Sequence, residues 1–300
     1  MKIRLAENFR AVFYAPFYAL KALNLSAAEG VEIEWLPPGS PGGAIGNVKS
    51  GAVDVTWGGP MRVLKDNDNS PKNGTSLTCF GEVVGRDPFY LVGKKHPTGF
   101  DLADLAATRL GVVSEVPTPW LCLQADLNDR KVDTLAMLKG KLVNPGLSMP
   151  DQLLAIKNGD LDVGQLFEPY ISQALAEGIG KILYAACDRG PTVYTTFICS
   201  GDGLLRHHEA FSGLYAALKK LQLWMQANGP DELSRLVTPF FPDVSSRLLH
   251  DSIRRYFVSG IWSKNPEVSR IGFDRLAHSL KAGGFIKSLI AYESCVHSFD

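Results

Sequence analysis

The chain has 300 residues, of which 45% are hydrophobic and 21% charged, as is typical of a globular protein. Its 31 Lys and Arg balance 31 Asp and Glu, and this zero net charge argues against a nucleic-acid partner. No segment of the sequence approaches the roughly 18 uninterrupted apolar residues of a membrane span. At about 150 residues per domain, the length predicts two domains.

The first ten residues lack the apolar segment and the cleavage site of a secretory signal peptide. We therefore expect a cytoplasmic protein if Met1 is the native start, and a periplasmic or lipid-anchored one if an export signal has been removed. The five cysteines are scattered and include no Cys-x-x-Cys pair, which indicates neither a disulfide framework nor a thiolate metal site. We expect buried thiols, no metal and no cofactor.

The first part of the chain predicts an α/β unit. Strands are expected at residues 2–5 and 31–36, and a helix begins at Pro16. Ser40, before Pro41, has the character of an N-cap of a second helix. Residues 49–55 (Lys-Ser-Gly-Ala-Val-Asp-Val) predict the end of that helix, a left-handed glycine cap and a third strand, and a further strand follows at 77–80.

The same elements return in the same order later in the chain. Residues 109–113 and 141–143 predict strands, a helix begins at Pro119, and residues 148–151 form a capping box. Residues 157–163 (Lys-Asn-Gly-Asp-Leu-Asp-Val) share the pattern Lys-x-Gly-x-x-Asp-Val with residues 49–55. This order of elements indicates duplication of a βαβαβ unit.

The last third of the chain is helical after one more strand. The strand is predicted at 193–200, and the apolar spacing then predicts helices at 209–226, 245–258 and 266–282. We expect this helical tail to pack on the first lobe. The predicted fold is α/β with two lobes, residues 1–90 plus 192–300 and residues 91–191, connected by two crossings.

Open α/β sheets bind ligands outside the carboxyl ends of their strands, and two-lobed proteins bind them between the lobes. That rule selects loops rich in aromatic residues, glycine and proline, most of which open a helix with free N–H groups. The candidate ligand-binding residues are Phe13, Tyr14, Ser40, Gly42, Trp57, Gly58, Gly59, Glu82, Asp87, Ser114, Glu115, Thr118, Trp120, Phe167, Glu168 and Tyr194.

Two kinds of contact are expected among these residues. The rings of Tyr14, Trp57 and Trp120 would stack on the ligand, and N–H groups near Gly42 and Gly59 would hold an acidic group. Each aromatic residue has an alternative interpretation as a core side chain beside a turn.

The carboxylates allow two interpretations as well. In the structural interpretation, Glu82, Glu115 and Glu168 are helix-start charges or partners of Arg62 or Arg86. In the functional one, they face a ligand that carries an amine.

The sequence contains no dinucleotide-binding fingerprint, Walker A loop, nucleophile elbow or metal-ligand spacing.

Four segments together resemble a known family: residues 13–23, 29–33 and 46–60, and Phe-Glu-Pro-Tyr at 167–170. They are similar to the nitrate/sulfonate/taurine and thiamine-pyrimidine substrate-binding proteins of ABC transporters, over most of the first 200 residues. The resemblance implies a periplasmic-binding-protein type II fold with a two-crossover hinge. It also implies a monomer that captures a small organic ligand, such as a pyrimidine, an aromatic acid or a sulfonate, for an ABC permease.

Two alternatives stand beside this function. The same fold is similar to that of cytoplasmic enzymes, among them the yeast-type pyrimidine synthase and the aromatic desulfinases, in which case Glu82, Asp87 or Glu168 would act as acid or base. The synthase's cysteine-rich motif is missing, and Tyr14 and Ala15 stand where the desulfinase has its nucleophilic cysteine. The second alternative is a ligand-sensing regulatory protein.

Overall fold

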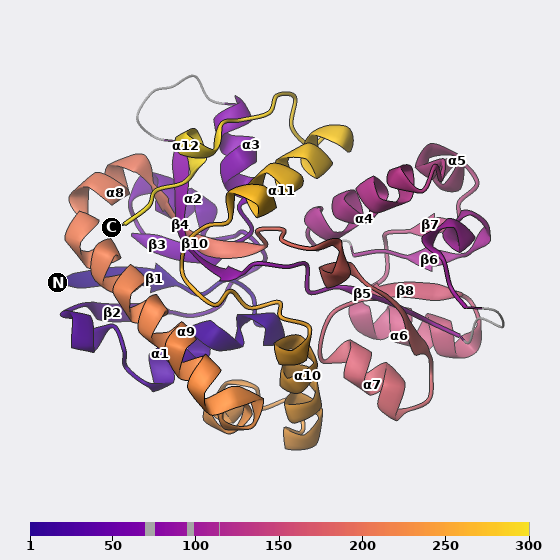
Figure 1. Ribbon diagram of the computed structural model, residues 1–300, viewed down its shortest axis with the longest axis horizontal. Coiled ribbons are helices and arrows are strands. Elements are labelled where there is room, and N and C mark those ends of the chain that lie inside the picture. The colour runs from indigo at the N-terminus through magenta and orange to yellow at the C-terminus, as the bar shows by residue number, and fades with distance from the viewer. Residues whose placement is uncertain (70–75, 95–98, 114, 300) are drawn as a thin grey trace. The chain divides into compact units, whose positions relative to one another are not determined.

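The computed structural model describes residues 1–69, 76–94, 99–113 and 115–299, which form two compact units (Figure 1). Unit 1 comprises Met1–Arg86 and Pro191–Asp300, and unit 2 comprises Asp87–Gly190. Within the described residues each unit contains a mixed five-stranded sheet, and the C-terminal region is helical. These features confirm the predicted α/β class with its helical tail.

The sheet of unit 1 has the order β2-β1-β3-β10-β4. β1 is parallel to β2 and β3, whereas β10 is antiparallel to both β3 and β4. The carboxyl ends of β1 to β4 therefore meet the start of β10 at one edge of the sheet, which we call the strand-end edge of unit 1. The strands are β1 (Lys2–Ala6), β2 (Glu32–Leu36), β3 (Val55–Gly58), β4 (Leu77–Val84) and β10 (Thr195–Ser200).

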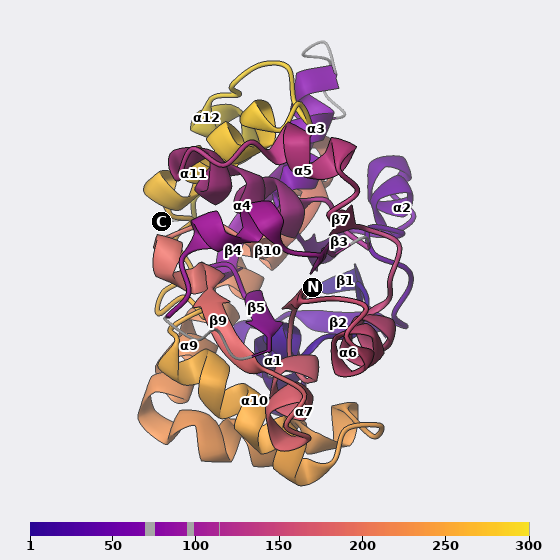
Figure 2. The same cartoon turned by 90° about the vertical axis from the view of Figure 1, so that its right-hand side faces the viewer.

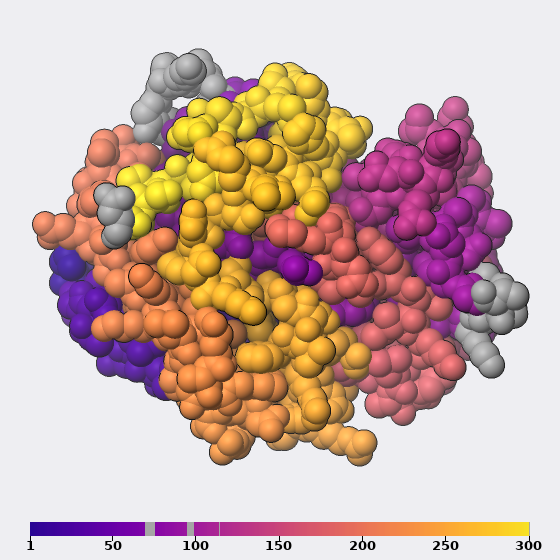
Figure 3. Space-filling view, viewed as in Figure 1, coloured from indigo at the N-terminus to yellow at the C-terminus, as the bar shows by residue number. Residues whose placement is uncertain are grey.

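Two groups of helices cover this sheet, one on each side (Figures 1 and 2). α1 (Ala15–Ala22), α9 (His208–Val237) and α10 (Ser246–Val258) pack together, and α3 (Met61–Asn69) packs against α11 (Arg270–Ala282) and α12 (Tyr292–Cys295). Residues of the C-terminal helices form much of the face of unit 1 seen in Figure 3. The predicted helical tail therefore completes the core of unit 1. The short helices α2 (Ile45–Ser50) and α8 (Gly201–Arg206) complete this unit.

Two predicted helix starts are wrong. Ser40 does not begin a helix: its carbonyl accepts the N–H of Gly43 (2.9 Å) in a turn, and α2 begins only at Ile45. Residues 266–269 precede α11 as an irregular segment, and Ser269 is the N-cap, accepting the N–H of Gly272 at its Oγ (3.0 Å). Before α11 the sequence offers both Pro266 and Ser269 as helix starts, and the serine is the one used, whereas neither Ser40 nor Pro41 opens a helix.

The sheet of unit 2 has the order β7-β6-β8-β5-β9, with β6 parallel to β7 and β8, and β5 antiparallel to β8 and β9. In Figures 1 and 2, α4 lies on one side of this sheet and α6 and α7 on the other. Its elements are β5 (Tyr90–Gly93), β6 (Leu110–Gly111), α4 (Thr118–Asp129), α5 (Thr134–Lys139), β7 (Val143–Asn144), α6 (Met149–Asn158), β8 (Val163–Leu166), α7 (Tyr170–Ala176) and β9 (Lys181–Ala185).

The repeated sequence pattern has the same local structure in both units. Gly51 and Gly159 end α2 and α6 in the left-handed conformation, with φ values of 76° and 88°, where a side chain is disfavoured. Ser148 caps α6, as predicted, by accepting the N–H of Asp151 (3.3 Å). The Asp151 carboxylate accepts the Ser148 hydroxyl (2.6 Å) and not its backbone N–H, so the reciprocal bond of a capping box is not formed. All five cysteines are buried, as expected.

The aspartate of each repeat forms the same bidentate pair with an arginine on the first strand. Arg4 Nη2 lies 2.8 Å from Asp54 Oδ1, and Arg4 Nε lies 3.2 Å from Oδ2, which also accepts the Arg4 backbone N–H at 2.7 Å. The equivalent distances from Arg109 to Asp162 are 2.6, 3.0 and 2.9 Å. We call this arrangement the Arg–Asp clamp.

Asp54→Asn is expected to lower the free energy of unfolding by about 1 to 3 kcal/mol, since an amide replaces charge-assisted acceptors. Burial raises the pKa of Asp54, but the hydrogen bonds from Arg4 and the charges of His207 and Arg4 outweigh it and lower the pKa below its usual value. The stabilisation is therefore present above about pH 4 and is lost as the pH falls through the lowered pKa. Urea unfolding at a series of pH values tests this.

The control is Asp243→Asn, which changes an exposed aspartate. An Asp54→Asn effect no larger than that of the control, or one that does not shrink at acid pH, would contradict the clamp's role.

Candidate ligand-binding site

Five segments of unit 1 meet at its strand-end edge. They are the segment after β1, the loop after β2, the end of β3 with the start of α3, the end of β4, and the start of β10. In the antiparallel register Thr196 pairs with Gly58, and Thr195 pairs with Val84. The sheet topology therefore brings together most of the candidate residues that lie in unit 1.

Asn8, immediately after β1, connects three of these segments. Its Nδ2 donates to the carbonyl of Trp57 (3.1 Å) and lies 3.5 Å from the Tyr14 hydroxyl, while its Oδ1 accepts the N–H of Gly42 (3.1 Å). Asn8 is 4% exposed, and both ends of its amide are used by the backbone. It therefore fixes the loop that contains Gly42 against the ends of β1 and β3.

The aromatic candidates of unit 1 lie in its interior. Trp57 is 1% exposed and stacks on Phe17, with ring centroids 4.4 Å apart and planes 8° from parallel. Phe13 is equally buried, and its carbonyl accepts the indole N–H of Trp262 (2.9 Å). Tyr14 packs edge-on against Trp57, with its hydroxyl toward Asn8. In this structure these rings support the strand-end edge, and Trp57 offers no exposed face for stacking.

Arg62, in the first turn of α3, places its guanidinium over a surface made of glycines. A Cβ added at Gly42 would lie 2.4 Å from Arg62 Nε, and one added at Gly58 or Gly59 would lie 3.8 Å from Nη1. Gly42 also has a φ of 75°, which a side chain would disfavour. These three glycines are candidates from the sequence, and the structure shows that they surround a cation.

The hydroxyl of Tyr14 belongs to the same group of side chains. Burial raises the pKa of Tyr14, although the nearby Arg62 charge and the side chains of Thr195 and Asn8 lower it. Tyr194, next to Thr195 at the start of β10, is 6% exposed and also acts on Arg62 electrostatically. The Arg62 guanidinium is thus surrounded by hydroxyl and amide groups.

Glu82 on β4 has a structural role. It accepts hydrogen bonds from the Ser263 hydroxyl (2.5 Å) and the Ser269 N–H (3.0 Å), and burial raises its pKa. It lines a separate pocket of about 520 Å³ with Arg86 and residues of the segment before α11. Glu82 therefore holds the C-terminal helices on the sheet.

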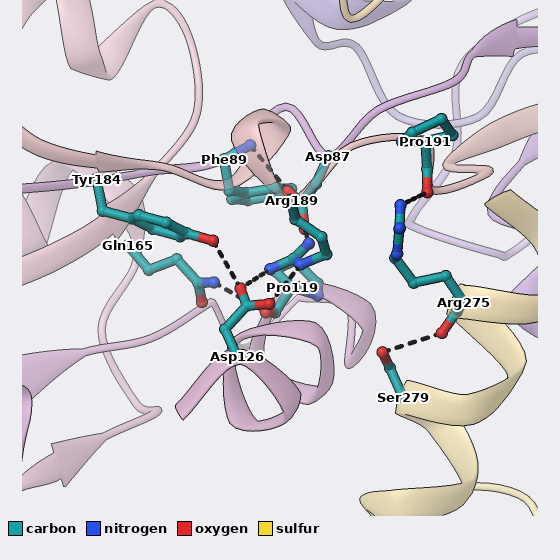
Figure 4. A network of polar contacts seen from close by, with 10 residues as sticks. All are labelled: Asp87, Phe89, Pro119, Asp126, Gln165, Tyr184, Arg189, Pro191, Arg275 and Ser279. Atoms are coloured by element: carbon teal, nitrogen blue, oxygen red, sulfur yellow. Dashed lines mark hydrogen bonds and ion pairs between the residues drawn. The ribbon is translucent and has the colours of Figure 1, made fainter. Parts of the chain in front are cut away.

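Asp87 belongs to a buried charge network in unit 2 (Figure 4). Its Oδ2 lies 2.7 Å from Arg189 Nη1, and Arg189 also donates to Asp126 Oδ1 (2.8 Å), whose second oxygen accepts the Tyr184 hydroxyl (2.9 Å). Burial lowers the pKa of Arg189, but the hydrogen bond to Asp126 and the Asp87 charge outweigh it and hold the pKa well above its usual value. Asp87 and Arg189 thus join the two ends of the unit 2 segment.

The remaining candidates of unit 2 surround the starts of α4 and α7. Glu168, fully buried, accepts the N–H and hydroxyl of Ser172 (both 2.9 Å). Trp120 is half-buried against the core of this unit, and Phe167 packs edge-on against Phe89. Thr118 is buried at the start of α4, Glu115 is exposed, and Ser114 lies outside the described residues.

Sequence reasoning missed Asn8 and Gln165 as positioning residues, and considered Arg62 only as a partner for glutamates. Gln165 in unit 2 resembles Asn8: it accepts the Val113 N–H (3.3 Å) and donates to the Pro119 carbonyl (2.9 Å). For Arg62 a signal existed, because a cation in the first turn of a helix opposes the helix dipole.

Arg189→Met is expected to lower the free energy of unfolding by about 3 to 5 kcal/mol, because it leaves two aspartates without their buried cation. Guanidinium unfolding of the full chain measures this, with Arg247→Met as the control because Arg247 is exposed on α10. Equal losses in the two variants would contradict the network's role.

Comparisons with known proteins agree with the fold. No family model matches the chain. YtlA of Bacillus subtilis (strain 168), described provisionally as a binding protein, is 21% identical in an alignment 313 residues long. The alignment covers 99% of this chain and 87% of that protein. The periplasmic aliphatic sulphonate binding protein SsuA from Escherichia coli has a TM-score of 0.77 at 13% identity, covering 100% of this chain and 92% of its own.

A second solved structure is the ligand-binding component of an ABC-type import system from Staphylococcus aureus, with zinc bound. It has a TM-score of 0.71 at 16% identity and covers 99% of this chain and 96% of its own. The chain therefore has the fold of the substrate-binding proteins that its sequence resembles. In the part described here, no cluster of three or more His, Cys, Asp or Glu side chains has the arrangement of a metal site, and no helix is long and apolar enough to span a bilayer.

Proposed function

We propose that this chain is a solute-binding protein that captures a small organic ligand at the strand-end edge of unit 1. The observation that carries the proposal is the surface formed by Gly42, Gly58 and Gly59 around the Arg62 guanidinium. At Gly42 the missing side chain lets the Arg62 guanidinium lie directly against the backbone, and Gly58 and Gly59 lie beside it. A few polar groups that converge beside backbone N–H groups are typical of small-molecule sites.

The hydrogen bonds and the ion pair made by the candidate carboxylates favour a binding function over a catalytic one. Glu82 and Glu168 accept hydrogen bonds from serines, and Asp87 is paired with Arg189. A general acid or base must reach the proton that it transfers. These three candidates for acid–base roles are instead engaged in contacts that hold helices and crossing segments in place.

The proposed partner is an ABC permease, and the proposed location is outside the cytoplasmic membrane. The support for both is the fold shared with the sulphonate binding protein and the import component described above. The ligand classes that we propose to screen first are pyrimidines, aromatic acids and sulfonates.

A thermal-stability screen against these three classes tests the function. A true ligand is expected to stabilise the protein by about 2.7 kcal/mol at a concentration 100-fold above its Kd, because it binds the folded state alone. Mass spectrometry of the recovered ligand separates binding from catalysis: an unchanged compound supports a solute-binding protein, and a converted one supports the enzyme alternative. A complete absence of stabilisation would contradict the proposal.

A further inference from the structure

We propose that Arg62 is an oxyanion receptor, so that the ligand carries a carboxylate, sulfonate or similar acidic group; this inference rests on the proposed function. Among the described residues, the Arg62 guanidinium forms no hydrogen bond and no ion pair with a carboxylate. Burial lowers its pKa, and the groups that oppose this shift are the hydroxyls of Tyr14 and Tyr194. A desolvated guanidinium stays charged and is normally paired.

The position of Arg62 in α3 strengthens this inference. α3 begins at Met61, so Arg62 lies in the first turn, where the helix N-terminus is already positive. That turn contains no acidic residue to offset the charge. The positive end of the helix and the positive guanidinium therefore act at one place. This repulsion destabilises the ligand-free protein, and an anion bound beside the two charges relieves it.

The absence of a side chain at Gly42 lets the guanidinium take its position beside the backbone. At Gly42 a Cβ would approach Nε, Nη2 and Cζ to within 2.4, 2.7 and 2.9 Å, so a side chain there would displace the planar group. Asn8 holds Gly42 in place through its amide oxygen. A guanidinium presents parallel N–H donors that match the two oxygens of a carboxylate or sulfonate, which an uncharged pyrimidine does not supply.

Pairs of probes that differ only in charge test the inference: benzoate with benzamide, and benzenesulfonate with benzenesulfonamide, titrated at constant ionic strength. We expect the anion of at least one pair to bind more tightly than its neutral analogue. Arg62→Gln should weaken the binding of that anion roughly 30-fold or more, since it removes a desolvated charge partner. Arg62→Lys, which retains the charge without the fork, should lose less.

Two controls make the result specific. Arg247→Gln removes the same charge from an exposed position on α10 and should leave the affinity unchanged. Gly42→Ala should weaken anion binding while Arg62 is still present, whereas Gly46→Ala, where an added Cβ meets nothing within 4 Å, should not. If Arg62→Gln fails to fold, the glycine pair still decides the question.

The outcomes separate the inference from the function on which it rests. If the screen of pyrimidines, aromatic acids and sulfonates yields only uncharged ligands, or if the affinity for an anion survives in Arg62→Gln, the receptor role is overturned and the solute-binding function stands. If neither charged nor neutral compounds bind, both fall. Anion-selective binding that is lost in Arg62→Gln and Gly42→Ala supports both.

Discussion

Each of the two repeats is closed by a bidentate Arg–Asp clamp. In unit 1 the residues that follow the clamp, Leu5 and Val55, are register partners across β1 and β3. In unit 2 Leu110 and Val163, which follow Arg109 and Asp162, are paired in the same way across β6 and β8. The ion pair therefore fixes the register of two parallel strands at the point where their pairing begins, and because strands are continuous, it also fixes where their carboxyl ends lie.

This arrangement keeps the clamp away from the proposed binding surface in unit 1. The clamp of Arg4 and Asp54 lies just before the paired residues of β1 and β3, whereas Asn8 and Arg62 lie beyond their carboxyl ends, where the loops are rich in glycine. The side-chain amide of Asn8 positions the loops at that edge, and the Arg62 guanidinium lies against the backbone of Gly42. A ligand bound there would meet a cation whose surroundings are already ordered, which reduces the entropic cost of binding.

The sequence predicted the fold class and the repeat because both depend on local signals. Glycine caps, proline helix starts and the apolar spacing of α9 to α11 are visible in single segments. Side-chain direction is not visible in this way. Trp57 lies at the end of β3 just before two glycines, where an exposed aromatic residue could also lie, yet it stacks on Phe17 in the core. Hydrogen-bond partners far apart in the sequence could not be predicted either, because Glu82 contacts Ser263 and Asp87 contacts Arg189 only in the folded chain. Arg62 was underestimated because its significance depends on Gly42, which lies in a different loop.

An acidic ligand bound as proposed would lie against Gly42, Gly58, Gly59 and Arg62 at the strand-end edge of unit 1. Hydrogen–deuterium exchange of the full chain, with and without the tightest-binding anion, shows whether it does. We expect slower exchange of the backbone N–H groups in residues 39–43 and 58–63. Unchanged exchange in both segments, with protection instead around the Glu82 pocket at residues 262–271, would contradict it.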